Sequence, residues 1–354
     1  MKKNVLVLCP HPDEKGGVAD YNYLLRKHFF SDRISLDFYH TGKTRGKEGC
    51  LSRLFKTLTD LFSLIKRFPN YELIVFNPSL DARAVIRDGV YHLVAKRLFH
   101  RRTLVLLHGW DRAFEHFVAS YGKRFFRFLF SCNRMLVLAG QFRDVLVDWG
   151  FPPEIVGLET TTYEQHESGR DRDIFKIVFL SRFTKNKGCL ESIRTVEMLA
   201  KEFPDVKLYM VGDGPLTGEL KTYVTSRGLG NNVEFTGWLQ GEEKYDLLNQ
   251  CGIMLFPTSY GEGMPISVIE GMGMGLAVLT RPVAGIRDIF CNGENGFLVQ
   301  TTDPSDFACK VRYLFQNRAD WERISAINKR KAEENFEIRS VVKRIELLYF
   351  ELAG

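Results

Sequence analysis

Short apolar runs alternate with longer stretches of helical spacing, and this alternation limits the fold more than any other feature. The runs at 4–9, 103–107 and 252–256 are almost continuously apolar, as is typical of strands buried on both faces of a parallel sheet. Because helical patterns separate such runs, the sequence predicts parallel sheets covered by helices. Further runs of this kind lie at 36–39, 73–77, 135–139, 175–180, 206–211, 233–236, 276–280 and 296–299.

Chain length and one polar stretch predict two domains. The chain has 354 residues, which is more than a typical single domain contains. Residues 159–173 are almost entirely polar and follow a Gly-Phe-Pro-Pro turn, so they form the best candidate for a linker. We therefore expect an α/β protein with one doubly wound domain at 1–160, a second at 161–335 and a C-terminal helix at 336–354.

The stretch at 257–275 carries the clearest functional pattern, PTSYGEGMPISVIEGMGMG. It follows an apolar run and begins with turn-forming residues, and Pro265 suits the first turn of a helix. Seven residues separate Glu262 from Glu270, which places one carboxylate in the loop and the other inside the helix. The free N–H groups at the start of such a helix favour an anion such as a diphosphate. Glu270 is then placed to accept hydrogen bonds from a diol such as a ribose.

Three further motifs precede this stretch in the second half of the chain. They are FLSRFTKNKG at 179–188, VGDGP at 211–215 and FTGWL at 235–239. In content and in order the four motifs resemble the GT-B glycosyltransferases of the retaining family 4. The resemblance is dense over 174–315 and weaker before it. It implies the GT-B fold, in which two doubly wound, Rossmann-like domains face a cleft and a C-terminal helix crosses back to the first domain.

The resemblance implies a diphosphate site, and it makes Arg182, Lys187, Glu262 and His108 the candidate catalytic residues. Arg182 and Lys187 would neutralise the diphosphate and the charge that develops as it leaves. The backbone N–H groups of Gly263 and Met264, next to Pro265, would add to this at the start of the helix. No divalent metal and no other cofactor is expected, and no Asp-x-Asp stands in a suitable loop.

Other residues would contact the rest of the donor. The resemblance assigns Glu262 to the donor sugar near the reacting centre and Glu270 to the ribose hydroxyls. The backbone around Trp238 and Leu239 would meet the base. The usual Glu-Ala-Met-Ala of the family is Glu-Gly-Met-Gly here, which keeps small residues but lowers intrinsic helix stability.

The first half of the chain adds three candidates. Gly16 and Gly17 follow the first apolar run and would let the backbone approach the donor closely, with a plain tight turn as the alternative. His108 follows the run at 103–107, and ligands of open α/β sheets collect beyond the carboxyl ends of strands. The resemblance also favours a His here beside the donor sugar, whereas a satisfied core histidine is the alternative. Asp111 is a weaker candidate.

Two stretches of the first half combine basic and aromatic residues at helical spacing. They span 53–68 and 114–133, and the second contains Lys-Arg-Phe-Phe-Arg-Phe-Leu-Phe. Such helices can lie in a membrane interface, but ordinary helices with one face on a sheet show the same pattern. Two of them together favour contact with an anionic membrane surface. The net charge of +6 is modest and no recognition motif accompanies it, so nucleic-acid binding is not expected.

The remaining features favour a cytoplasmic protein. Seven scattered cysteines form no C-x-x-C pair, so neither a zinc site nor a disulfide framework is indicated. The apolar run at the N-terminus is too short for a signal peptide, and no run reaches membrane-spanning length. The sequence therefore predicts a protein of the cytoplasm that can contact the inner face of the membrane.

Together with these observations, the resemblance implies a retaining hexosyltransferase. It would move a hexose-type sugar from a nucleotide-diphospho-sugar to a saccharide or lipid-linked acceptor, in bacterial surface polysaccharide or lipopolysaccharide synthesis. Two rivals are a GT-B nucleotide-sugar epimerase, which acts without an acceptor, and a catalytically silent subunit that binds the nucleotide-sugar. A silent copy would have no need to keep Arg182, Lys187, Glu262 and Glu270 together.

Overall fold

The chain forms two compact units in the computed structural model, which describes residues 2–11, 14, 16–42, 50–166, 172–261, 263–283 and 285–354. The first unit comprises Met1–Thr162, Gly261–Met264 and Ile338–Gly354, and the second comprises Tyr163–Tyr260 and Pro265–Glu337. The unit boundaries thus fall at 162 and 337, where the sequence placed them at 160 and 335. The short loop at 261–264 groups with the first unit, which no local pattern indicates.

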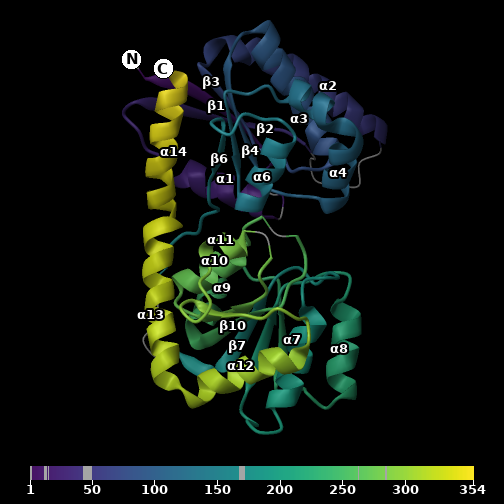
Figure 1. Cartoon of the computed structure of the whole chain (residues 1–354), viewed down its shortest axis with the longest axis vertical. Coiled ribbons are helices and arrows are strands. Elements are labelled where there is room, and N and C mark those ends of the chain that lie inside the picture. The colour runs from purple at the N-terminus through teal and green to yellow at the C-terminus, as the bar shows by residue number, and fades with distance from the viewer. Residues whose placement is uncertain are drawn as a thin grey trace. The chain divides into compact units, whose positions relative to one another are not determined.

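The first unit is built on a six-stranded parallel sheet (Figure 1). Its strand order is β2-β1-β3-β4-β5-β6, so the chain winds outward in both directions from the β1–β3 pair. The three central strands are buried along nearly their whole length, which explains why their sequences are continuously apolar. The strands are β1 (Lys3–Cys9), β2 (Ile34–His40), β3 (Leu73–Phe76), β4 (Arg102–Leu107), β5 (Arg134–Val137) and β6 (Val156–Leu158).

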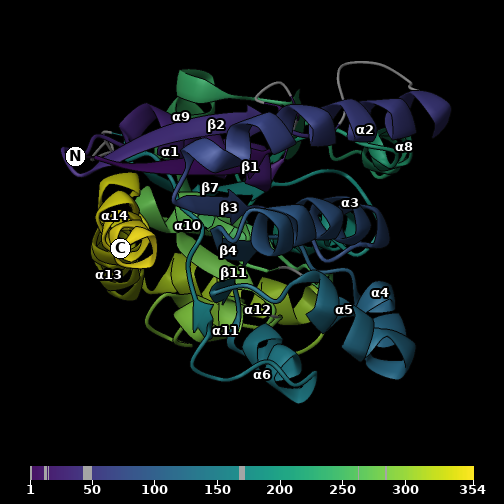
Figure 2. The same cartoon turned by 90° about the horizontal axis from the view of Figure 1, so that it is seen from above.

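Helices cover this sheet, and the predicted helix at 114–133 has three parts. A π-helical segment, Val118–Gly122, joins α4 to α5. The predicted helix at 53–68 is α2, which begins at residue 50. Figure 2 shows α2, α3 and the α4–α5 segment following one another along one side of the unit. The helices are α1 (Gly17–His28), α2 (Cys50–Arg67), α3 (Ala82–Leu93), α4 (Arg112–Phe117), α5 (Lys123–Leu129) and α6 (Gly140–Asp148).

The C-terminal helix α14 (Ile338–Ala353) also belongs to the first unit. It packs against α1 and against the strands β1 to β4. Val341, Ile345 and Tyr349 are buried, so the apolar spacing of this segment faces that sheet. The helix that follows the second unit in sequence is thus part of the first unit's core.

The second unit repeats the architecture with a sheet in the order β12-β11-β10-β7-β8-β9. Here the chain winds outward from the β7–β10 pair, and all pairs are parallel. The strands are β7 (Asp173–Leu180), β8 (Lys207–Val211), β9 (Val233–Gly237), β10 (Cys251–Phe256), β11 (Ala277–Thr280) and β12 (Gly296–Leu298). The helices are α7 (Cys189–Leu199), α8 (Thr217–Ser226), α9 (Gly241–Gln250), α10 (Ile266–Gly273), α11 (Ile286–Ile289), α12 (Pro304–Gln316) and α13 (Arg318–Asn335).

Candidate functional site

The four predicted motifs of the second unit meet at one edge of its sheet. They follow β7, β8, β9 and β10, and the carboxyl ends of parallel strands lie on the same side. Backbone hydrogen bonds join the loops: Phe183 N–H donates to the Asp213 carbonyl (3.0 Å) and Gly212 N–H donates to the Gly237 carbonyl (2.8 Å). The loops after β7 and β10 flank the point where strand order reverses, which is where ligands of open α/β sheets bind.

The backbone carbonyl of Asn186 joins the loop after β7, which carries Arg182 and Lys187, to the loop after β10. This carbonyl accepts from the N–H groups of Ser259 (2.8 Å) and Tyr260 (3.0 Å). Gly188 lies so close to this second loop that a Cβ atom would stand 2.6 Å from the Pro257 carbonyl oxygen, and its φ of 85° also favours glycine. The absence of a side chain at Gly188 is therefore what allows the two loops to approach this closely.

Both predicted diphosphate residues stand on this loop. Arg182 is exposed. Lys187 is half-buried, with its ammonium 4.4 Å from the centre of the Tyr260 ring, a cation–π distance. The structure thus brings Arg182 and Lys187 to the loop beside the helix α10 and adds Tyr260, an aromatic neighbour that sequence reasoning did not single out.

The start of α10 matches the predicted helix. Pro265 is the residue before its first turn, and among the described residues no side-chain cap is found at this end of the helix. Glu262 lies outside the described residues. Trp238 is exposed and Leu239 is half-buried directly after β9, at the same edge of the sheet. The roles assigned to these residues remain predictions.

Glu270 is buried inside α10 in a polar cluster that was not predicted. Its Oε1 atom accepts hydrogen bonds from Lys244 Nζ (2.6 Å) and from the Tyr245 hydroxyl (3.1 Å). Both donors belong to α9, the helix that precedes β10. The His166 ring stacks on the Tyr245 ring, with centroids 3.5 Å apart and planes 19° from parallel. No spacing rule links positions 244 and 270, so only the fold shows that they meet.

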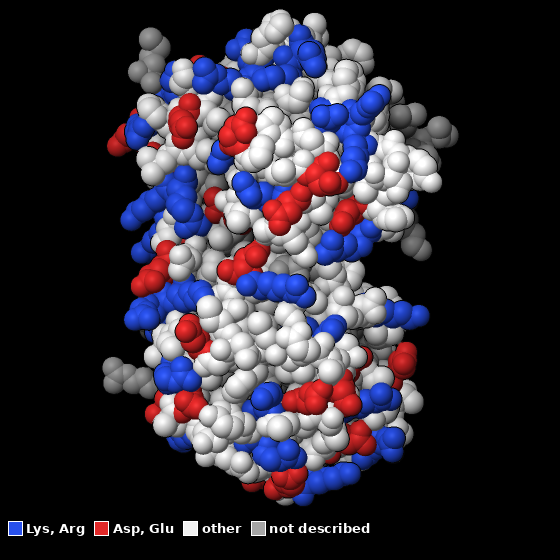
Figure 3. Space-filling view, in the orientation of Figure 1, with Lys and Arg blue, Asp and Glu red and all other residues white. Residues whose placement is uncertain are grey.

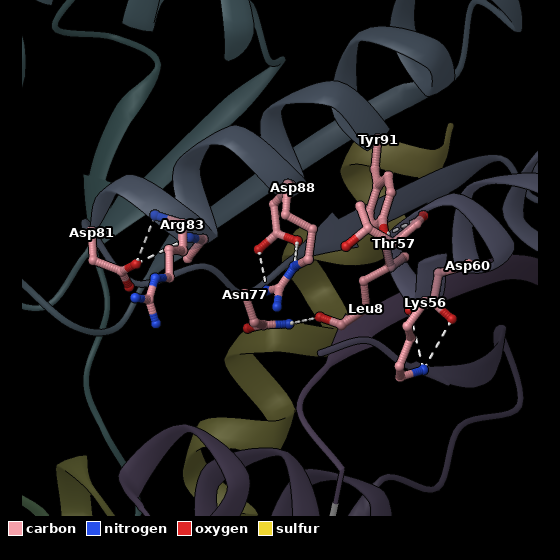
Figure 4. Close-up of polar contacts among 11 residues, drawn as sticks. Leu8, Lys56, Thr57, Asp60, Asn77, Asp81, Arg83, Asp88 and Tyr91 are labelled. Atoms are coloured by element: carbon pink, nitrogen blue, oxygen red, sulfur yellow. Dashed lines mark hydrogen bonds and ion pairs between the residues drawn. The ribbon is translucent and has the colours of Figure 1, made fainter. Parts of the chain in front are cut away.

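In the first unit, His108 ends a chain of hydrogen bonds across three neighbouring strands. Asn77 follows β3, and its Nδ2 donates to the carbonyl of Leu8 in β1 (3.0 Å), as Figure 4 shows. Its Oδ1 is therefore the acceptor for Nε2–H of His108, which follows β4 (2.9 Å). This pairing assigns the proton of the neutral imidazole to Nε2 and leaves Nδ1 as an acceptor.

Burial determines the charge of this histidine. His108 is 8% exposed, and burial lowers its pKa to about 3. The Tyr21 ring meets the imidazole edge-on, with centroids 4.9 Å apart, and adds to the apolar surroundings. The group is therefore neutral at ordinary pH, so it can accept a hydrogen bond from a ligand hydroxyl but cannot contribute a positive charge.

Other first-unit candidates have local structural roles as well. Gly16 precedes α1 with a φ of 149°, a conformation that favours glycine, and Gly17 is the first residue of that helix. Asp111 caps α4 by accepting from the N–H groups of Ala113 and Phe114, which accounts for its position without a ligand. Within the same unit, a Cβ at Gly263 would lie 2.9 Å from the His108 carbonyl oxygen, and Met264 is buried.

Comparison with solved structures defines the class of fold. The chain resembles Anabaena HepE, crystallised with UDP and glucose, with a TM-score of 0.74 and 18% identity over 97% of this chain and 98% of that one. It also resembles sucrose-phosphate synthase of Thermosynechococcus elongatus, with a TM-score of 0.77 and 16% identity over 99% of each chain. Two doubly wound α/β units in this arrangement of elements are the GT-B fold.

Sequence comparison points to a family over part of the chain. Residues 162–332, just under half of the chain, match the family described as "Glycosyl transferases group 1". The amylovoran biosynthesis glycosyltransferase AmsK of Erwinia amylovora is 24% identical over 68% of this chain and 61% of its own length. The lipopolysaccharide core biosynthesis glycosyltransferase LpsD of Rhizobium meliloti is 30% identical over 44% of this chain and 43% of its own. The chain thus spans less than two thirds of these relatives.

Proposed function

We propose that this protein transfers a hexose-type sugar from a nucleotide-diphospho-sugar to a saccharide or lipid-linked acceptor, with retention at the anomeric carbon. The observation that carries the proposal is the meeting of four motif loops at one edge of the second sheet, where the loops after β7 and β10 flank the switch point. There two cationic side chains, Arg182 and Lys187, share one loop, and the buried carboxylate of Glu270 stands on the adjoining helix. This set of groups suits a diphosphate and a diol.

The relatives support the same activity and suggest its setting. AmsK and LpsD are named for polysaccharide and lipopolysaccharide synthesis, and HepE has been crystallised with UDP-glucose. We therefore place this enzyme in bacterial surface polysaccharide or lipopolysaccharide synthesis. The donor diphosphate leaves with its charge neutralised by Arg182 and Lys187, and the leaving phosphate assists deprotonation of the acceptor, so the reaction needs neither a protein nucleophile nor a metal.

One experiment separates a transferase from its rivals. Purified protein is screened by thermal shift with UDP-, GDP-, ADP- and dTDP-sugars, and the stabilising donor is then incubated with and without candidate acceptors. A transferase releases nucleotide in an acceptor-dependent manner. Product without acceptor would indicate an epimerase, and binding without turnover would indicate a silent subunit.

A broad apolar face on the first unit favours a membrane-bound acceptor. Among the described residues, α2 exposes Phe55 and Phe62, α3 exposes Ile86, and the α4–α5 segment exposes Tyr121 and Phe125. Tyr121 and Phe125 are 85% and 59% exposed, which is unusual for large aromatics that have no partner to cover them. Because α3 packs against both α2 and α5, the helices that carry these exposed side chains are neighbours. Sequence reasoning found α2 and α4–α5 but missed α3 between them.

A hydrogen bond links two of these helices. The Tyr91 hydroxyl of α3 donates to the Thr57 carbonyl of α2 (3.0 Å), and both residues are labelled in Figure 4. Exposed Lys66, Arg67 and Arg124 lie on the same helices, and Figure 3 shows Lys and Arg side chains beside uncharged surface over the region of α2 and α4. Aromatic and basic side chains together suit the interface of an anionic leaflet.

The enzyme would accordingly work at the cytoplasmic surface of the membrane. No helix among the described residues is long and apolar enough to cross a bilayer. Binding to anionic vesicles should fall as salt rises, since exposed charges are screened. Replacing Tyr121, Phe125 and Phe128 with Ser should weaken vesicle binding but leave donor binding intact.

Two further variants sharpen this test. Lys123 pairs with Asp148 and Arg127 donates to the Gly150 carbonyl, so Arg124→Glu is the cleaner charge change. Phe30→Ser is the control, because Phe30 is 83% exposed but stands on none of the three helices. Wild-type protein that ignores anionic vesicles at low salt would point to a soluble acceptor instead.

A further inference from the structure

Both hydrogen bonds that the protein donates to Glu270 end on the same oxygen. Lys244 Nζ and the Tyr245 hydroxyl lie 2.6 Å and 3.1 Å from Oε1. A carboxylate oxygen offers about two acceptor directions, so these donors fill those of Oε1. In the part of the chain that the structure describes, no side chain or N–H group donates to Oε2. The carboxylate thus has one oxygen held by the protein and one directed elsewhere.

The two donors are themselves held in place. The Tyr245 ring is 6% exposed and stacked by His166, and Lys244 Nζ lies 4.6 Å from the centre of the same ring. Burial and the neighbouring Glu270 raise the pKa of the Tyr245 phenol above its usual range, so the hydroxyl keeps its proton and donates. The Lys244 and Glu270 side chains are 18% and 9% exposed, which shields their ion pair from solvent.

We propose that Lys244 and Tyr245 are positioning residues that direct Oε2 of Glu270 to the 2′- and 3′-hydroxyls of a ribose, so that the site selects ribonucleoside diphosphates over their 2′-deoxy counterparts. The inference rests on the proposed function, because it assumes a nucleoside diphosphate at this edge of the sheet. To that function it adds the class of donor, which is a sugar linked to a ribonucleoside diphosphate rather than to deoxythymidine diphosphate.

The selectivity follows from the fixed carboxylate. A buried charged acceptor that loses one hydroxyl partner keeps an uncompensated lone pair, which weakens binding of the deoxy analogue. A carboxylate that could rotate would follow the remaining 3′-hydroxyl and recover part of the loss. The bonds from Lys244 and Tyr245 prevent this rotation, so removing either donor relaxes the discrimination.

The experiment compares matched pairs of nucleotides by isothermal titration with the full-length chain. UDP, GDP and ADP are each titrated beside the 2′-deoxy form of the same base, into wild type, Lys244→Met and Tyr245→Phe. For the base that binds, we expect wild type to prefer the ribonucleotide by roughly tenfold or more. Each variant should reduce this ratio of affinities by roughly threefold or more, mainly by weakening the binding of the ribonucleotide.

Controls separate positioning from general stability. Lys207→Met breaks an ion pair with Glu234 (2.7 Å) in the same unit, and it should leave the ratio unchanged. Melting temperatures identify any variant that has lost its fold, and Tyr245→Phe keeps the ring that stacks on His166. The inference is overturned if wild type binds the ribonucleotide and the deoxyribonucleotide with equal affinity. It is also overturned if both variants keep the wild-type ratio of affinities, whether or not they bind both nucleotides more weakly. Failure of wild type to bind any nucleoside diphosphate would instead reject the proposed function, and that result appears before any variant is made.

Discussion

The buried polar cluster around His108 in the first unit and the one around Glu270 in the second hold opposite kinds of group. In the first unit, His108 has a neutral partner, Asn77, and burial lowers its pKa to about 3. In the second, Glu270 is equally buried but has a cationic partner, Lys244. Burial penalises a charge unless an opposite charge accompanies it, so the partner decides whether the buried group is neutral or ionic.

The difference suits the two halves of the expected reaction. A neutral imidazole can accept a hydrogen bond from a sugar hydroxyl without attracting the anionic part of the donor. A carboxylate held by a lysine can bind a diol strongly, because hydrogen bonds to charged groups are about twice as strong as neutral ones. Four experiments test this difference between the two units.

Acid should destabilise the first unit, because two of its buried histidines must be neutral in the folded state. Burial lowers the pKa of His92 to about 4 and that of His108 to about 3, from an ordinary value of 6.5. Below pH 6.5 the unfolded chain binds protons that the folded unit does not, so stability is lost as pH falls toward 3. Each histidine should lower the free energy of unfolding by on the order of 3 kcal/mol between pH 6.5 and pH 3.

The free energy of unfolding as a function of pH checks this expectation, with hydrogen exchange assigning the loss to the first unit. His92→Gln and His108→Gln should each flatten the pH dependence, whatever they do to stability at pH 8. An unchanged slope in both variants would show that other groups cause acid unfolding.

Asn77→Asp should turn the neutral cluster into a charged one. A carboxylate would then stand within hydrogen-bond distance of Nε2 of His108, and it should raise the pKa of His108 by roughly 1–3 units. Titration of the imidazole signals by NMR measures the change. His92, which bonds the Leu129 carbonyl and the Thr103 hydroxyl, serves as the internal reference. If the His108 signal does not move, Asn77 is not its partner.

Lys187→Ala should weaken binding of a nucleoside diphosphate by roughly 1.5–3 kcal/mol, the usual contribution of a charge-assisted contact to phosphate. Lys185→Ala removes an exposed lysine from the same loop and is the matched control. Arg182→Lys should also be harmful, because a point charge replaces a planar fork. Wild-type affinity and rate in both Lys187→Ala and Arg182→Lys would refute the diphosphate assignment.

His108→Ala should lower turnover. We expect the activation free energy to rise by roughly 0.5–1.5 kcal/mol, the net contribution of one hydrogen bond. Its melting temperature at pH 8 should change far less than its rate. Steady-state kinetics and thermal denaturation on the same preparation test this. Full activity, or an unfolded variant, would mean that His108 serves packing alone.

Local patterns predict most of the strands and helices, but they miss one short strand and one irregular helical segment. The apolar runs at 4–9 and 252–256 became β1 and β10 within a residue or two, because periodicity and turn residues are local properties. The short strand β6, of three residues, gave too little pattern to be found. The π-helical segment at Val118–Gly122 was read as ordinary helix, since its side-chain pattern does not differ from that of a helix.

The order of strands and helices, and the four motif loops with Arg182, Lys187 and Glu270, can be predicted from the sequence, because they depend on residue types close together in the chain. Which side chains meet depends on the three-dimensional packing. Lys244 reaches Glu270, and Asn77 reaches His108, across separations of 26 and 31 residues. Both contacts follow from how parallel strands and their helices pack side by side, and that packing brings together residues whose spacing in the chain carries no period.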